Sequence, residues 1–175
     1  MTKKILIILL TAIFAGCSNS GTENIPNTPS TPKDQIASLT SSGVIPDLER
    51  GTDIAGTDTN SNGIRDDIES YINDNYSVPH QHAAAIQSAT ALQEALLLDT
   101  TNTITVKEVN RKIARADHCI YKQFDGENNS KQPAQVSQEI ESITTNTKER
   151  LLAYLAFSKA LDGTSWAIPE GDTCE

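Results

Sequence analysis

Residues 79–98 read PHQHAAAIQSATALQEALLL, and this stretch decides the fold class. Its apolar residues return every three or four positions, the spacing that places side chains on one face of an α-helix. The inward face is expected to comprise Ala85, Ile86, Ala89, Leu92 and Leu96. Ser77 is the expected N-cap, and Pro79 fits the first helical turn, where its missing N–H costs nothing. The many alanines allow neighbouring helices to approach closely.

The helical period continues before and after this stretch. Before it, a helix that ends near Ser77 is predicted by an apolar face of Ile68, Tyr71, Ile72 and Tyr76. After it, Thr105 and Glu108 have the spacing of a capping box, which starts a helix. The inward face of that helix is expected to comprise Val106, Val109, Ile113, Ala116 and Ile120.

A longer helical pattern covers residues 133–161. Its apolar positions are Val136, Ile140, Ile143, Leu151, Tyr154 and Leu155. Residues 144–147 read TTNT, and these weak helix formers leave open whether the stretch is one helix or two. Asn146 with Glu149 would cap the second helix. Because strand-like alternation is absent, we predict an all-α fold, a small bundle of four or five helices preceded by a loop and a disordered tether.

A twelve-residue segment before the first predicted bundle helix has the layout of a calcium loop. Residues 58–69 read DTNSNGIRDDIE, with oxygen-bearing side chains at loop positions 1, 3, 5, 9 and 12 and glycine at position 6. Ca²⁺ takes about six to eight oxygen ligands, which such a coiled loop can supply. The predicted ligands are Asp58, Asn60, Asn62, the backbone carbonyl of Ile64, Asp66 and Glu69. Three carboxylates indicate weak affinity, roughly 10⁻⁴ to 10⁻³ M. The alternative is a polar turn that only caps the next helix.

The loop resembles those of EF-hands, dockerins and thrombospondin type 3 repeats over residues 58–69. It departs from paired EF-hands at loop position 8, where Arg65 replaces an aliphatic residue. The preceding segment contains Pro46, Gly51 and Gly56, which disfavour a long entering helix. Since the sequence contains one such loop, we expect calcium to hold structure rather than to switch it.

The N-terminus has the layout of a secretory signal. Lys3 and Lys4 precede an apolar run, residues 5–14, that is shorter than the roughly 20 residues of a spanning helix. Residues 14–17 read FAGC and resemble the lipobox of bacterial lipoproteins, although leucine is usual at the first position. The resemblance implies a signal peptide over residues 1–16 and lipidation of Cys17. The alternative is an ordinary secretory signal with a chance cysteine.

The resemblance also implies a location in the bacterial cell envelope. Ser18, in place of aspartate, indicates sorting to the outer membrane, and residues 18–34 are too polar to bury a core. We therefore predict a flexible linker over residues 17–40 and a helical domain over residues 41–175. The net charge of −9 argues against nucleic acid and anionic lipid faces as partners. The expected attachment to the membrane is the lipid anchor.

Cysteine usage fits an oxidising compartment. With Cys17 assigned to lipid, Cys119 and Cys174 remain and are expected to pair. Closing a loop of this length stabilises by about 4 kcal/mol in the chain-entropy model. The alternative is two free thiols.

Catalytic motifs are absent from the sequence. It contains no G-x-S-x-G, Walker, H-E-x-x-H or G-x-G-x-x-G pattern. His80, His82 and His118 are poorly spaced for a metal site. Asp67 is expected to face solvent or the helix N-terminus, and residues 148–150 are expected to form a solvated helix face. We therefore expect no enzymatic activity.

The function favoured by these features is a membrane-anchored envelope lipoprotein with a calcium-stabilised binding or structural domain. The combination looks like that of small Gram-negative envelope lipoproteins without a known activity. A second hypothesis is a protein–protein interaction module, an inhibitor or assembly factor of an envelope component, that uses a helical face. A hydrolase with a carboxylate pair is the weakest alternative.

Overall fold

The structure is a computed structural model that describes residues 31–126, 131–165, 167 and 169–175. The predicted signal peptide, the lipidation site Cys17 and most of the predicted linker lie outside these residues. In the described ranges all regular structure is helical, which confirms the predicted all-α class. The helices are α1 (Pro32–Ser41), α2 (Asp66–Asn75), α3 (Pro79–Leu97), α4 (Thr103–Phe124), α5 (Pro133–Thr144) and α6 (Lys148–Ala160).

The chain divides into two units, Met1–Ser38 and Leu39–Glu175. Of the first unit, the structure describes the beginning of α1. Thr31 and Asp34 close the start of this helix, because the Thr31 hydroxyl donates to the Asp34 carboxylate (2.7 Å) and the Asp34 N–H donates back (3.2 Å). No residue of α1 is buried. This helix occupies part of the stretch that the sequence assigned to the linker.

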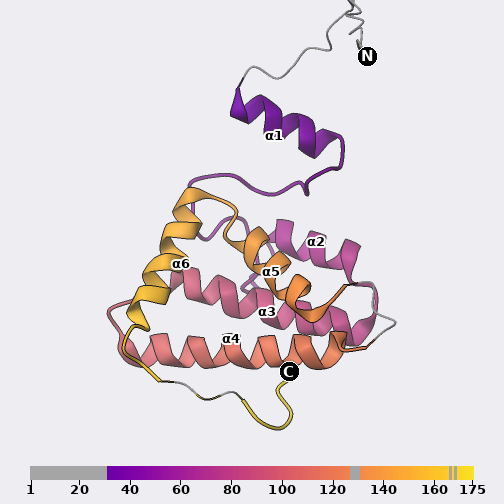
Figure 1. The fold of residues 1–175 in the computed structure, drawn as a ribbon. Coiled ribbons are helices and arrows are strands. Elements are labelled where there is room, and N and C mark those ends of the chain that lie inside the picture. The colour runs from indigo at the N-terminus through magenta and orange to yellow at the C-terminus, as the bar shows by residue number, and fades with distance from the viewer. Residues whose placement is uncertain (1–30, 127–130, 166, 168) are drawn as a thin grey trace, which may run out of the picture. The chain divides into compact units, whose positions relative to one another are not determined.

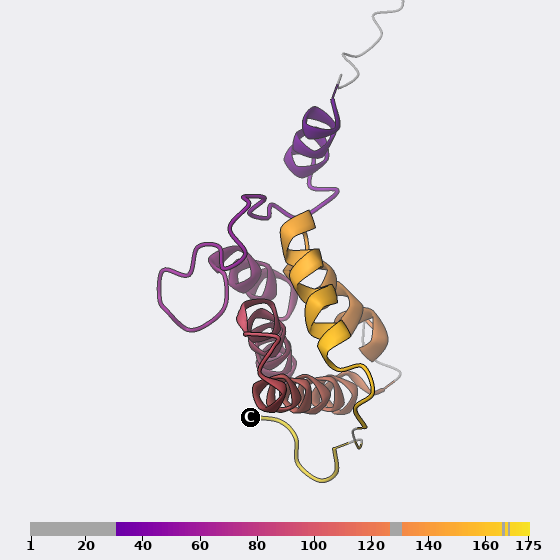
Figure 2. The same cartoon turned by 90° about the vertical axis from the view of Figure 1, so that its left-hand side faces the viewer.

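The second unit is organised around α3. This helix contacts α2, α4, α5 and α6, and its alanine-rich surface lets them approach. Figure 1 shows α3 and α4 running side by side. In Figure 2, turned by 90°, α6 lies nearest the viewer, in front of α5. Within the described residues, no helix has the length and apolarity needed to cross a bilayer.

One apolar core joins five segments of this unit. It comprises Ile64, Ile68, Ile72, Tyr76, Ala84, Ala85, Ala89, Leu92, Cys119, Ile120, Phe124, Val136, Ile140 and Ile143. The rings of Tyr76 and Phe124 meet edge to face at 5.6 Å. Most inward positions predicted for α2 to α5 are therefore buried. The prediction was wrong for α6, where Leu151 and Leu155 are 45% and 53% exposed.

Residues 133–161 form two helices, and the caps differ from those predicted. The side chain of Thr147, rather than Asn146, caps α6 by accepting from the Arg150 N–H at 3.3 Å. Asn102, rather than Thr105, caps α4. Asparagine is among the best N-cap residues, so α4 starts one turn earlier than the capping box indicated. The N-cap of α3 is Val78, without a side-chain hydrogen bond, rather than Ser77.

A polar cluster around Glu139 and a disulfide tie parts of the second unit together. Glu139 on α5 accepts hydrogen bonds from Tyr71 and from Tyr76 (2.6 Å) and pairs with Lys131 (2.6 Å). Glu139 therefore ties α2 to α5. A disulfide between Cys119 and Cys174, with an S–S distance of 2.05 Å, fastens the C-terminal segment to α4.

Candidate metal site and its attachment to the bundle

The predicted calcium loop is closed on itself at its first half. The Asp58 carboxylate accepts from the backbone N–H groups of Asn62 (3.2 Å) and Gly63 (2.9 Å). Gly63 has a φ of 84°, and a Cβ there would meet nothing within 4 Å. Glycine is thus needed at loop position 6 for its backbone conformation and not for space.

The end of the loop returns to its middle. The Asn60 and Asn62 side-chain amides donate to the two oxygens of the Glu69 carboxylate, at 3.0 and 2.9 Å. The Ile64 N–H in turn donates to the Asn62 side-chain oxygen at 2.9 Å. Four of the predicted ligand side chains, those of Asp58, Asn60, Asn62 and Glu69, therefore belong to one connected network.

Asp66, the predicted ligand at loop position 9, has a different set of contacts. Its carboxylate accepts from the Thr59 hydroxyl (2.6 Å) and the Thr59 N–H (2.9 Å). These bonds lower the pKa of Asp66 below its ordinary value. In the described part of the chain, no group of three or more His, Cys, Asp and Glu side chains is placed to hold a metal ion. The predicted ligand set also includes oxygens outside these four residue types, namely the side-chain amide oxygens of Asn60 and Asn62 and the backbone carbonyl of Ile64.

Arg65, at loop position 8, attaches the loop to the bundle. Its side chain is fully buried and pairs with Asp67 at 2.9 Å. It also donates to the backbone carbonyls of Ile143 and Thr144, both at 3.1 Å. These are the last carbonyls of α5, which have no partner within their own helix. The residue that departs from the EF-hand pattern is therefore a C-terminal cap for a distant helix.

Of the two positions predicted for Asp67, facing solvent or at the helix N-terminus, the structure shows the second. Besides pairing with Arg65, its carboxylate accepts from the Glu49 N–H at 2.8 Å and from the Ile68 N–H at 2.9 Å. The second bond lies at the N-terminus of α2, as one of the predicted roles required. Burial of Arg65 demands a neutralising partner, and Asp67 supplies that charge.

Arg150 is a second buried arginine, and the predicted solvated face was wrong at this position. Its side chain is 0% exposed and pairs with Glu49 at 3.0 Å. It donates to the backbone carbonyls of Glu49 (2.8 Å), Asp53 (2.9 Å) and Ile54 (3.3 Å). Burial and the nearby Arg65 charge lower the pKa of Arg150 from its ordinary value. Arg150 thus holds the irregular segment of residues 49–54, which precedes the loop, against α6.

Gly56 lets this segment pass the two arginines. Its φ is 67°, and a Cβ there would lie 2.3 Å from Cδ of Arg65 and 2.9 Å from a terminal nitrogen of Arg150. Both the backbone conformation and the space exclude a side chain. We call Glu49, Arg65, Asp67, Asn146 and Arg150 the arginine clamp. The clamp lies between the loop and the junction of α5 with α6.

None of the histidines belongs to a group of three or more His, Cys, Asp and Glu side chains that could hold a metal ion among the described residues. His82 bonds to the side-chain oxygen of Asn73 at 2.8 Å, and His118 bonds to the hydroxyl of Thr173 at 2.9 Å. The spacing of residues 58–69 predicted the loop, but no pattern of neighbouring residues predicted the arginine clamp.

Comparison with protein-family models, curated proteins and solved structures found no match to this chain.

Proposed function

We propose that this chain is a lipid-anchored envelope protein whose helical domain, a binding or structural module, is stabilised by Ca²⁺ at residues 58–69. The observation that carries the proposal is the return of the Glu69 carboxylate to the Asn60 and Asn62 amides. Loop positions 3, 5 and 12 are thereby within hydrogen-bond distance of one another. This is the proximity that a shared cation requires.

The residues of the loop fit a hard cation in their chemistry. An asparagine amide turned by 180° presents its oxygen where its nitrogen now donates. Asn60 and Asn62 would then offer neutral oxygens beside the Glu69 carboxylate, and Asp58 and the Ile64 carbonyl would complete the set with Asp66. The charge of Ca²⁺ would replace the amide protons as the partner of Glu69. Its role would be to link the two ends of the loop.

The clamp explains how such a link would matter to the whole domain. Arg65 and Asp67 lie inside the loop sequence and bond to the α5 end and to Glu49. A cation that fixes residues 58–69 would also fix the positions of Arg65 and Asp67. Calcium would therefore stabilise the start of the helical domain rather than open a groove.

The test is the calcium dependence of thermal unfolding. At about ten times the dissociation constant, a ligand that binds the folded state adds about 1.4 kcal/mol, which raises Tm by about 3–6 °C for a domain of this size. Glu69→Ala and Asp58→Ala should remove the calcium-dependent rise, whatever they do to the metal-free Tm. Asp74→Ala, which removes a carboxylate from α2 outside the loop, should keep it. A wild-type Tm that does not respond to millimolar Ca²⁺ would remove the metal from the proposal.

The anchor has its own test. Growth with an alkyne-bearing fatty acid should label the protein at Cys17, and Cys17→Ser should abolish the label and release the protein from the membrane fraction. Labelling that persists in Cys17→Ser would refute lipidation at this residue. This experiment does not depend on calcium, so the two parts of the proposal can fail separately.

A second candidate function is a protein–protein interaction module. It is favoured by α6, where Leu151, Leu152 and Leu155 are 45%, 54% and 53% exposed on one side of the helix. A photo-crosslinker at position 152 that captures one envelope protein, equally with and without a chelator, would favour this function. Capture that is lost when a chelator removes calcium would mean that partner binding depends on the calcium-bound domain of the first proposal.

A further inference from the structure

A row of cations runs along one side of α4 in a chain whose net charge is −9. Lys107, Arg111 and Arg115 are four residues apart, and Lys122 continues the row two turns later. Like charges at this spacing repel one another and destabilise an isolated helix. Anionic groups beside this row would offset the repulsion between its charges.

The C-terminal segment supplies such partners for half of the row. Lys122 pairs with Asp172 at 3.2 Å, and Arg115 pairs with Glu175 at 3.5 Å. The Cys119–Cys174 disulfide holds this segment in place between the two ion pairs. The protein's own carboxylates thus show which chemistry this side of α4 accepts.

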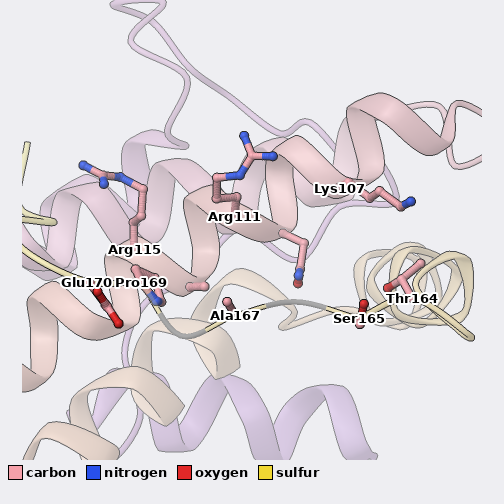
Figure 3. A pocket seen from close by; sticks show the side chains of 10 residues that line it. Lys107, Arg111, Arg115, Thr164, Ser165, Ala167, Pro169 and Glu170 are labelled. Carbon is pink, nitrogen blue, oxygen red and sulfur yellow. The ribbon is translucent and has the colours of Figure 1, made fainter.

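The other half of the row borders a cavity. Within the described residues, neither the Lys107 nor the Arg111 side chain forms an ion pair or a hydrogen bond. Both line a cavity of about 470 Å³, together with Asn110 and Arg115 on α4 and with Thr164 and Ser165 on the segment after α6. One carboxylate, that of Glu170, also lines this cavity, at the end where Arg115 lies. Figure 3 shows the three cations in a row along α4 and the segment with Thr164 and Ser165 passing beside that helix. This volume is in the usual range of small-molecule sites.

We propose that this cavity binds a small organic anion through Lys107 and Arg111, with a phosphate or carboxylate as the recognised group. The guanidinium fork of Arg111 matches both groups in bidentate geometry, and Lys107 adds a second, more mobile charge. The amide of Asn110 and the hydroxyls of Thr164 and Ser165 supply hydrogen bonds for the rest of the ligand. The site is separate from the calcium loop and does not depend on the function proposed above.

The test is a titration of the full chain, in neutral detergent and metal-free buffer, followed by NMR of the arginine Nε–H groups. Pyrophosphate probes the phosphate and glutarate probes the carboxylate, so the two arms identify the group. We expect a saturable shift of the Arg111 signal with at least one probe. Arg111→Gln and Lys107→Gln should each weaken binding about tenfold, the usual value of one charged hydrogen bond.

Lys148→Gln is the matched control, because it removes the same charge from an exposed position on α6. It should leave the affinity unchanged. Equal weakening by Lys148→Gln and Arg111→Gln would mean attraction to overall charge and would overturn the proposal. An Arg111 signal that does not saturate with either probe would overturn it too. Because Lys107 and Arg111 are exposed, both variants should keep the wild-type circular dichroism spectrum.

Discussion

The buried side chains of Arg65 and Arg150 share one acceptor, the side-chain oxygen of Asn146, at 3.4 and 2.9 Å. Asn146 also donates its amide to the Glu49 carbonyl at 2.8 Å. Two guanidinium groups can lie this close only because Asp67 and Glu49 balance their charges. The turn between α5 and α6 is therefore the point at which the loop of residues 58–69 and the preceding segment are joined to the bundle.

Arg150→Met should destabilise the domain by about 3–5 kcal/mol, because it leaves the Glu49 carboxylate and several backbone carbonyls without their donor. Urea unfolding followed by circular dichroism measures this loss. Lys148→Met, two residues earlier on the exposed side of α6, is the matched control and should change stability by less than about 0.5 kcal/mol. A similar small effect for both variants would mean that the clamp contributes little to stability.

Gly56→Ala should cost more than an alanine at another glycine with positive φ. At Gly163, with a φ of 73°, a Cβ would meet nothing within 4 Å, so Gly163→Ala should cost about 1–2 kcal/mol for the backbone alone. At Gly56 the same backbone cost is joined by displacement of Arg65, whose Cδ is 2.3 Å from the added atom. The loss of unfolding free energy in Gly56→Ala minus that in Gly163→Ala measures the steric cost of displacing Arg65. Equal losses would show that the arginine can move aside.

Local patterns could predict the helices and the loop, because both are encoded within a few residues. The clamp could not be predicted in this way. Arg65 bonds to Thr144, 79 residues later, and Arg150 bonds to Glu49, 101 residues earlier. In α6 the buried positions are Arg150 and Phe157, a spacing of two helical turns. The pattern had favoured Leu151 and Leu155, because a buried arginine carries no apolar signal.

The contribution of Glu139 to stability should be lost in acid. Burial tends to raise the pKa of Glu139, but the bonds from Lys131, Tyr71 and Tyr76 outweigh it and lower the pKa below the ordinary value. The folded state therefore binds this proton less readily than the unfolded state. The contribution is complete above the unfolded pKa of about 4.3 and is lost as the pH falls through the folded pKa.

Glu139→Gln should therefore flatten the dependence of the unfolding free energy on pH in this acidic range. The measurement is a series of urea titrations between about pH 6 and pH 3. Glu108→Gln, at an exposed position on α4, is the control for loss of one carboxylate. Parallel curves for Glu139→Gln and wild type would contradict a lowered pKa for Glu139.

Loss of the disulfide should destabilise the domain and free its C-terminal segment. Cys119 and Cys174 enclose a separation of 55 residues, for which the chain-entropy model gives about 4 kcal/mol as an upper figure. Cys174→Ser is the better variant, because Cys119 is 1% exposed and a hydroxyl there would be buried. We expect Cys174→Ser to lower the unfolding free energy by about 2–4 kcal/mol in urea.

Thiol counting separates this prediction from its alternative. Unreduced protein with Cys17 modified should show no free thiol, and a reductant should lower its stability to that of Cys174→Ser. The same reduction should also weaken the Lys122–Asp172 and Arg115–Glu175 pairs, because the segment that carries both acids is no longer tethered between them. Faster hydrogen exchange confined to residues 169–175 after reduction would report that release. Two free thiols in the unreduced protein, with no change in stability on reduction, would contradict the disulfide.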